Sequence, residues 1–212
     1  MYRGKNWLAA GLALLLAACT AQDSEDYKPS KHVADLNNGA VRALNEKDPA
    51  RALALVNEAI SIEPNFYKAY ANQAAILNQL GRTGEAAAAL QKLIAVKPEY
   101  AEAYVPLGLF LEKLFLEKLG KSEEAMAQYK KASELYAALA QAKPKDANPA
   151  INRAVALFLS NNKREAAESL GAYLAKYPDN EYAKKVKSKI EHSDRKSFVS
   201  SMPEQADKAP AK

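Results

Sequence analysis

The chain has 212 residues, 49% of them apolar, and a formal net charge of +5 at pH 7. This length suffices for one domain or two small ones, and a composition with many Ala and Leu and only 8 Gly favours helix. Residues 20–180 carry 20 basic and 20 acidic side chains, whereas residues 181–212 carry 8 basic and 5 acidic ones. A neutral body with a basic end is not typical of a nucleic-acid binder, so we expect no nucleic-acid partner.

The first residues have the pattern of an export signal. Arg3 and Lys5 precede an apolar run that extends to Ala18. This run is too short to span a bilayer, but it has the length of the apolar part of a signal peptide. It ends in Leu-Ala-Ala-Cys at residues 16–19, which resembles a bacterial lipobox. The alternative is an ordinary signal peptide cleaved nearby, with Cys19 incidental.

The lipobox resemblance implies that residues 1–18 are a lipoprotein signal peptide and that Cys19 carries the lipid, palmitate among its acyl chains. Two or more acyl chains anchor a protein stably, and a single cysteine has no disulfide partner within the chain. Thr20 follows the cysteine, which in Gram-negative bacteria resembles the outer-membrane default. We therefore expect a periplasm-facing protein, lipid-anchored in the outer membrane of a bacterial envelope. Residues 19–31 are predicted to be its lipidated N-terminus and flexible tether.

The middle of the sequence repeats with a period of 34 residues. The period shows in two pairs, Pro64 with Pro98 and Ala52 with Ala86. Between the two prolines the apolar pattern predicts two helices joined by a turn at Gly81. The second helix is expected to end before Pro98, because the residue that precedes a proline disfavours the α conformation.

This repeat resembles the tetratricopeptide (TPR) repeat, a helical hairpin that stacks into a solenoid. The matching residues of the best unit are Tyr70, Ala74, Leu77, Gly81, Glu85, Ala86, Leu90 and Pro98. The resemblance implies an all-α TPR solenoid of about four repeats over residues 32–194, with units at 33–66, 67–100, 101–146 and 147–180. In the fourth unit Asn161 stands where the turn glycine is expected, and Asn enters the left-handed region more easily than most residues.

Two further features complete the expected solenoid. Small residues are predicted where helix axes approach closely, and they are Ala40, Ala74, Gly108 and Ala154. Residues 181–194 are expected to form a capping helix that buries Tyr182, Val186 and Ile190, because one helical hairpin cannot bury its own apolar face. Residues 195–212 are polar, and we expect a disordered tail there.

The third unit is longer than the others. Residues 110–119 read FLEKLFLEKL, and deleting one copy of the pentad restores the spacing to the turn at Gly120. Its second helix contains about two further turns, so we expect a tall hairpin that stays helical through the duplication. Pro106 is expected to kink or loosen the start of the first helix.

The extra turns of this hairpin have two interpretations. Neighbours of ordinary height cannot cover them fully, which leaves Phe110, Phe115 and Leu116 as candidate apolar contacts for a partner or a second copy. The alternative is partial coverage by the long second helix of the same hairpin.

TPR proteins usually bind peptides or partner proteins along a concave face made by the first helix of each unit. The resemblance places twelve residues there: Asn37, Asn38, Val41, Lys68, Ala71, Asn72, Ala75, Val105, Leu109, Ile151, Asn152 and Val155. Asn amides can pair with an extended peptide backbone, and aliphatic side chains can bury apolar ones. The alternative for each is an ordinary solvated helix face.

No catalytic constellation emerges from the sequence. Its two histidines, His32 and His192, lie near opposite ends, and no glycine-rich phosphate loop is present. We expect no enzymatic activity, cofactor, metal or small-molecule substrate. The resemblance implies a lipid-anchored adaptor or scaffold that binds a protein or peptide, in assembly of an envelope complex of the pilus or secretion type. The alternative is a structural subunit of a fixed assembly, with contacts through the long third hairpin and the basic cap.

Overall fold

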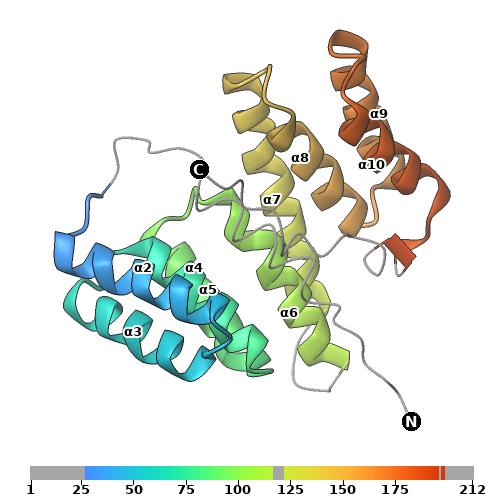
Figure 1. Ribbon diagram of the computed structural model, residues 1–212. Helices are drawn as coiled ribbons and strands as arrows, with labels where there is room; N and C mark the ends of the chain where they lie inside the picture. Colours follow the sequence, from blue (N-terminus) through green and yellow to red (C-terminus); the bar gives the residue numbers. More distant parts are fainter. Residues whose placement is uncertain (1–26, 117–121, 196, 199–212) are drawn as a thin grey trace.

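The computed structural model describes residues 27–116, 122–195, 197 and 198, and within them the chain is all-α, with no strand. The helices stack side by side in chain order from α2 to α10 (Figure 1). Their bounds are α2 Lys31–Asn45, α3 Pro49–Ile62, α4 Tyr67–Gln79, α5 Thr83–Val96, the 3₁₀ turn η1 Ala101–Ala103, α6 Tyr104–Leu116, α7 Ser122–Ala142, α8 Ala147–Leu159, α9 Lys163–Lys176 and α10 Glu181–His192.

The helices form four successive pairs. The members of each pair, α2–α3, α4–α5, α6–α7 and α8–α9, pack together, and each pair also packs on the next one. Helix α10 packs against α9 and α8 at the end of the stack. This arrangement is a solenoid of helical hairpins with a terminal helix, so the predicted fold class is confirmed.

The turns inside the hairpins share one backbone conformation. Lys47, Gly81 and Asn161 hold the corresponding positions in the first, second and fourth units, and their φ angles are +61°, +73° and +65°. The expected left-handed conformation of Asn161 is therefore confirmed. Lys47 adopts it too, although its turn lacks Gly and Asn at that position. The corresponding Gly120 lies outside the described residues.

The second helix of each pair ends two residues before a proline. These helices end at Ile62, Val96, Ala142 and Lys176, and the prolines are Pro64, Pro98, Pro144 and Pro178. Because the residue before a proline disfavours the α conformation, the chain leaves the helix at the same point in every unit. The rule holds in the longer third unit as well as in the regular ones.

The four predicted small residues lie in tightly packed parts of the core. Ala40, Ala74 and Ala154 are completely buried. At Gly108 an added Cβ would lie 2.6 Å from Cε1 of Tyr129, far inside van der Waals contact. Tyr129 is itself completely buried, so its ring fills the space that the missing side chain leaves.

The third hairpin has a long second helix and an irregular first one. Helix α7 has 21 residues, whereas α3, α5 and α9 have 14 each. The first helix starts with the 3₁₀ turn Ala101–Ala103 before α6 begins at Tyr104. Pro106 has no N–H to donate to the carbonyl of Glu102, so a regular α-helical first turn cannot form. The duplicated stretch is helical up to Leu116, and residues 117–119 lie outside the described part of the chain.

One predicted apolar contact on this hairpin is wrong. Phe110 is 1% exposed and belongs to the main core. Residues 104–111 of α6 are all buried, because this level of the helix packs against both α5 and α7. Phe110 therefore has no free face to offer a partner. The side chains of Phe115 and Leu116 lie outside the described part of the structure.

The two ends of the solenoid differ from expectation in detail. Tyr182 is 47% exposed, whereas Ala183, Val186 and Ile190 form the buried stripe of the capping helix. In the predicted tether, Tyr27 donates a hydrogen bond to Glu63 over 2.6 Å and stacks on Phe66.

The predicted disordered tail is wrong at its start. Residues Asp194, Arg195, Ser197 and Phe198 form a short turn that packs on the solenoid, and we call it the C-terminal turn. Phe198 is 2% exposed. A single aromatic side chain that becomes buried can order a short polar segment, because its burial contributes about 1.5–3 kcal/mol.

Candidate functional site

The candidate site is the face formed by the first helices α2, α4, α6 and α8, here called the first-helix face. Of the twelve residues predicted to line it, Asn38 is exposed, and Val41, Lys68 and Asn152 are half-buried. The other eight are buried: Asn37, Ala71, Asn72, Ala75, Val105, Leu109, Ile151 and Val155. A partner can therefore reach Asn38, Lys68 and Asn152 directly, while most of the aliphatic side chains belong to the packed interior.

Two predicted residues meet across the first two units. The side-chain amide of Asn72 donates to Oδ1 of Asn37 over 2.7 Å, and both residues are buried. Helices α2 and α4 contact each other directly at this face. The bond links neighbouring first helices, so these two amides serve the packing of the stack.

A second polar cluster lies where the third and fourth units meet. Tyr136 of α7 is buried, which raises its pKa well above the ordinary value, and Asn152 of α8 acts on that pKa in the opposite direction. Burial also raises the pKa of Glu102, while Lys143 and Lys97 act weakly in the opposite direction. Glu102 is a half-buried carboxyl group on the same helical segment as the predicted site residues Val105 and Leu109.

The sequence did not predict that the C-terminal turn would reach this face. Arg195 forms an ion pair with Glu112 of α6, and its guanidinium lies 5.4 Å from the ring centroid of Tyr129. The ring of Phe198 packs on Phe158 of α8, with centroids 4.6 Å apart. The only available signal was an Arg and a Phe three residues apart in a polar segment, which has no periodicity to interpret.

Tyr129 links this contact to the core. Its hydroxyl donates to Oε2 of Glu112 over 3.0 Å, and its ring lies against Gly108. Burial is the main cause that raises the pKa of Tyr129, and the carboxylate of Glu112 acts in the same direction. The phenol therefore stays neutral and donates to the carboxylate at neutral pH.

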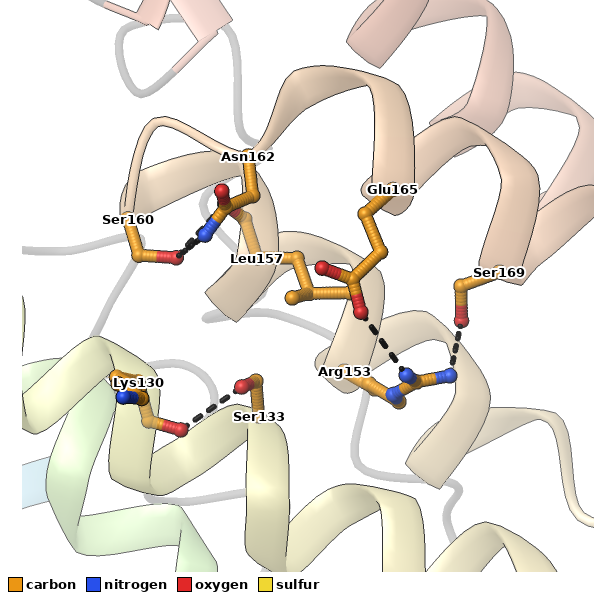
Figure 2. Close-up of polar contacts among 8 residues, drawn as sticks. All are labelled: Lys130, Ser133, Arg153, Leu157, Ser160, Asn162, Glu165 and Ser169. Atoms are coloured by element: carbon orange, nitrogen blue, oxygen red, sulfur yellow. Dashed lines mark hydrogen bonds and ion pairs between the residues drawn. The ribbon is translucent and has the colours of Figure 1, made fainter.

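A separate hollow of about 480 Å³ is lined by residues of α7, of α8, of the turn after α8 and of the start of α9. Figure 2 shows its polar contacts. The guanidinium of Arg153 donates to Oγ of Ser169 over 2.9 Å and to Glu165 over 3.3 Å. Ser133 and Ser160 donate to backbone carbonyls of their own helices. These polar groups are bonded within the protein, so the hollow has no array of groups directed at a ligand.

The described residues also bear on two other kinds of site. No cluster of three or more His, Cys, Asp or Glu side chains there could hold a metal ion. In the same part of the chain, no helix has both the length and the apolar character needed to cross a membrane.

Comparison with known proteins identifies the repeats. A family model of the tetratricopeptide repeat matches residues 67–100 and 101–139, and the first of these ranges coincides with the second unit of the sequence. A search of curated protein sequences gives no match.

Solved structures show the same fold. A tetratricopeptide repeat protein from Parabacteroides merdae is similar with a TM-score of 0.55 and 18% identity, over 83% of this chain and 62% of that one. A thermophilic TPR protein from Thermus thermophilus is similar with a TM-score of 0.52 and 20% identity, over 82% of this chain and 91% of that one.

Two of the four units therefore match the tetratricopeptide repeat, and the stack as a whole has the fold of solved tetratricopeptide repeat proteins, as the sequence indicated. This fold supports a role as an adaptor or scaffold in protein–protein interactions, and proteins of the class are generally non-enzymatic scaffolds.

Proposed function

We propose that this protein is a lipid-anchored adaptor of the bacterial envelope. It captures a protein or peptide partner on the first-helix face while Cys19 holds it at the outer membrane, facing the periplasm. The envelope process served is assembly of a complex of the pilus or secretion type. The observation that supports capture is the single face of stacked first helices, to which three of the four units contribute accessible polar residues.

The accessible residues of that face define the proposed contact. Three of the four units each contribute one such residue: Asn38 lies on α2, Lys68 on α4 and Asn152 on α8. Asn amides can donate and accept at once, which suits a peptide backbone. The ammonium of Lys68 adds a positive charge that favours acidic groups.

The contact is tested by site-specific photo-crosslinking in intact cells. A photo-reactive residue is placed at Asn38, Lys68 or Asn152, and matched controls carry it at Glu58 of α3, Ala88 of α5 or Glu168 of α9, which are exposed on second helices. We expect one partner to be cross-linked from the first-helix positions and not from the controls. Equal or stronger cross-linking from the second helices would overturn the proposal.

The anchor has its own test. Cells that express the chain are labelled with radioactive palmitate, and the envelope is separated into inner and outer membranes. We expect label on the parent chain in the outer-membrane fraction, and loss of both label and membrane association in Cys19→Ala. Label that persists in the variant would contradict the lipobox.

A second candidate function is that of a structural subunit fixed through the long third hairpin and the basic cap. The specific observation in its favour is the length of α7, which exceeds that of the other second helices by one half. If Phe115→Asp or Leu116→Asp abolishes partner cross-linking while Asn38→Ala leaves it intact, the subunit function replaces the adaptor function.

A further inference from the structure

The C-terminal turn occupies a defined place on the first-helix face. On α6, Glu112 lies three residues after the predicted site residue Leu109, and on α8, Phe158 lies three residues after Val155. Side chains three or four apart share one helix face. Glu112 and Phe158 therefore extend the same face in two neighbouring units, and the C-terminal turn bridges them.

The contact has a specific chemistry. A guanidinium fits between the carboxylate of Glu112 and the ring of Tyr129, where both the charge and the aromatic face attract a cation. An aromatic ring then fits against Phe158. We call these three residues, Glu112, Tyr129 and Phe158, the cation–aromatic subsite.

The turn that fills the subsite is pre-organised. The carboxylate of Asp194 accepts from both the backbone N–H and the hydroxyl of Ser197, each over 2.8 Å. The backbone N–H of Phe198 donates to the carbonyl of Asp194 over 2.9 Å. A helical turn closed in this way puts the side chains of Arg195 and Phe198, three residues apart, on one side.

The fit of this turn is nevertheless incomplete. Nε of Arg195 is buried and has no hydrogen-bond partner among the residues that the structure describes. A buried donor without a partner loses its hydrogen bonds to water and gains none in return. The turn therefore binds the subsite less tightly than a segment that brings its own acceptor for this donor and whose guanidinium donors are thus all hydrogen-bonded.

We propose that the cation–aromatic subsite is the recognition site for a partner segment that presents an arginine and, three residues later, an aromatic residue. The chain's own C-terminal turn occupies this site until such a segment displaces it. This inference rests on the proposed adaptor function and names the chemistry of the partner. A tethered occupant competes at an effective concentration in the millimolar range, so only segments that bind better, or are locally concentrated, replace it.

The test uses a fluorescent, end-blocked peptide with the sequence Ser-Asp-Arg-Lys-Ser-Phe, titrated by anisotropy into the full chain held in mild detergent. The parent chain is compared with the double variant Arg195→Ala/Phe198→Ala, whose subsite is vacated. We expect the Kd of the vacated chain to be at least tenfold lower than that of the parent. Peptides with Ala in place of Arg or of Phe should lose this gain.

A charge exchange provides a check that is independent of the double variant's folding. In Arg195→Glu the turn is repelled by Glu112, so we expect tighter peptide binding than in the parent, with an unchanged far-UV CD spectrum. Adding Glu112→Arg should restore the internal ion pair and also abolish binding of the arginine peptide. In this double variant, Arg195→Glu/Glu112→Arg, the turn again occupies the subsite. A peptide with Glu in place of Arg should therefore bind it no more tightly than the original peptide binds the parent.

Three results would overturn the proposal. They are equal Kd values for the parent and the vacated chain, equal binding of the alanine-substituted peptides, and a concentration-dependent dimer of the parent that disappears with Phe198→Ala. The last would assign the subsite to the turn of a second copy. None of these outcomes affects cross-linking at Asn38 or Lys68 on the first two units, so failure here and failure of the adaptor function are distinguishable.

Discussion

The contact between Gly108 and Tyr129 allows a quantitative test of the packing in the third hairpin. In Gly108→Ala the new Cβ would lie 2.6, 2.8 and 3.0 Å from three atoms of the Tyr129 ring. The ring cannot move away freely, because it is completely buried and its hydroxyl is bonded to Glu112. Inserting a methyl group into a well-packed core costs about 1–3 kcal/mol.

A second effect of the same substitution acts in the opposite direction. Alanine in a helix interior is favoured over glycine by about 1 kcal/mol. The net expectation for Gly108→Ala is therefore a loss of up to about 2 kcal/mol in the free energy of unfolding. Urea denaturation followed by far-UV CD measures this loss, and the slope m should stay unchanged because the exposed surface is the same.

Gly171→Ala is the matched control. Its Cβ would lie 3.4 Å from Cε of Lys187, an ordinary contact with a flexible side chain, so the helix preference should dominate and stabilise the protein by up to about 1 kcal/mol. In a Tyr129→Leu background, Gly108→Ala should lose its cost. The packing argument is refuted if Gly108→Ala stabilises the parent protein as Gly171→Ala does.

Four further substitutions test other parts of the structure by the same urea denaturation. Lys47→Gly should raise the free energy of unfolding by about 0.5–1 kcal/mol, because Lys47 has a φ of +61° that glycine adopts freely. Gly81→Ala should lower it by about 1 kcal/mol, although the space around the new Cβ is open. A destabilising Lys47→Gly would contradict the assignment of the turn. Asn72→Ala should cost about 1–3 kcal/mol, since it leaves the buried Asn37 oxygen without this donor; a loss below about 0.5 kcal/mol would mean that the bond does not hold the two first helices together. Glu102→Gln should stabilise the protein at pH 7 and change nothing well below pH 4.5. The reason is that the pKa of Glu102 is raised in the folded state, so the parent protein loses stability as this carboxyl ionises with rising pH. A variant that is less stable than the parent at pH 7 would contradict the burial of this carboxyl.

The sequence predicted the repeat well because its signals are local. Prolines after each second helix and small residues at the close approaches follow from backbone geometry within one hairpin. Asn161 could be placed in the turn from its own conformational preference, without reference to any neighbour. The same argument did not extend to Lys47, whose left-handed conformation is imposed by the hairpin around it.

The wrong prediction for Phe110 and the unpredicted contacts of the C-terminal turn have a different physical origin. Phe110 was expected on an exposed surface because the pentad duplication rotates the following side chains, yet it precedes the inserted turns and α6 is buried on all sides at that level. Arg195 and Phe198 bind surfaces far away in the sequence, on α6 and α8. Such contacts depend on the shape of the assembled solenoid, which no pattern within a polar segment reveals.

Hydrogen exchange of the full chain, with and without the partner identified by cross-linking, tests the central claim most directly. If the first-helix face binds the partner, backbone amides of α2, α4, α6 and α8 should gain protection in the complex, while those of α3, α5 and α9 should exchange as before. Protection confined to α3, α5 and α9, or to the capping helix α10, would contradict the account.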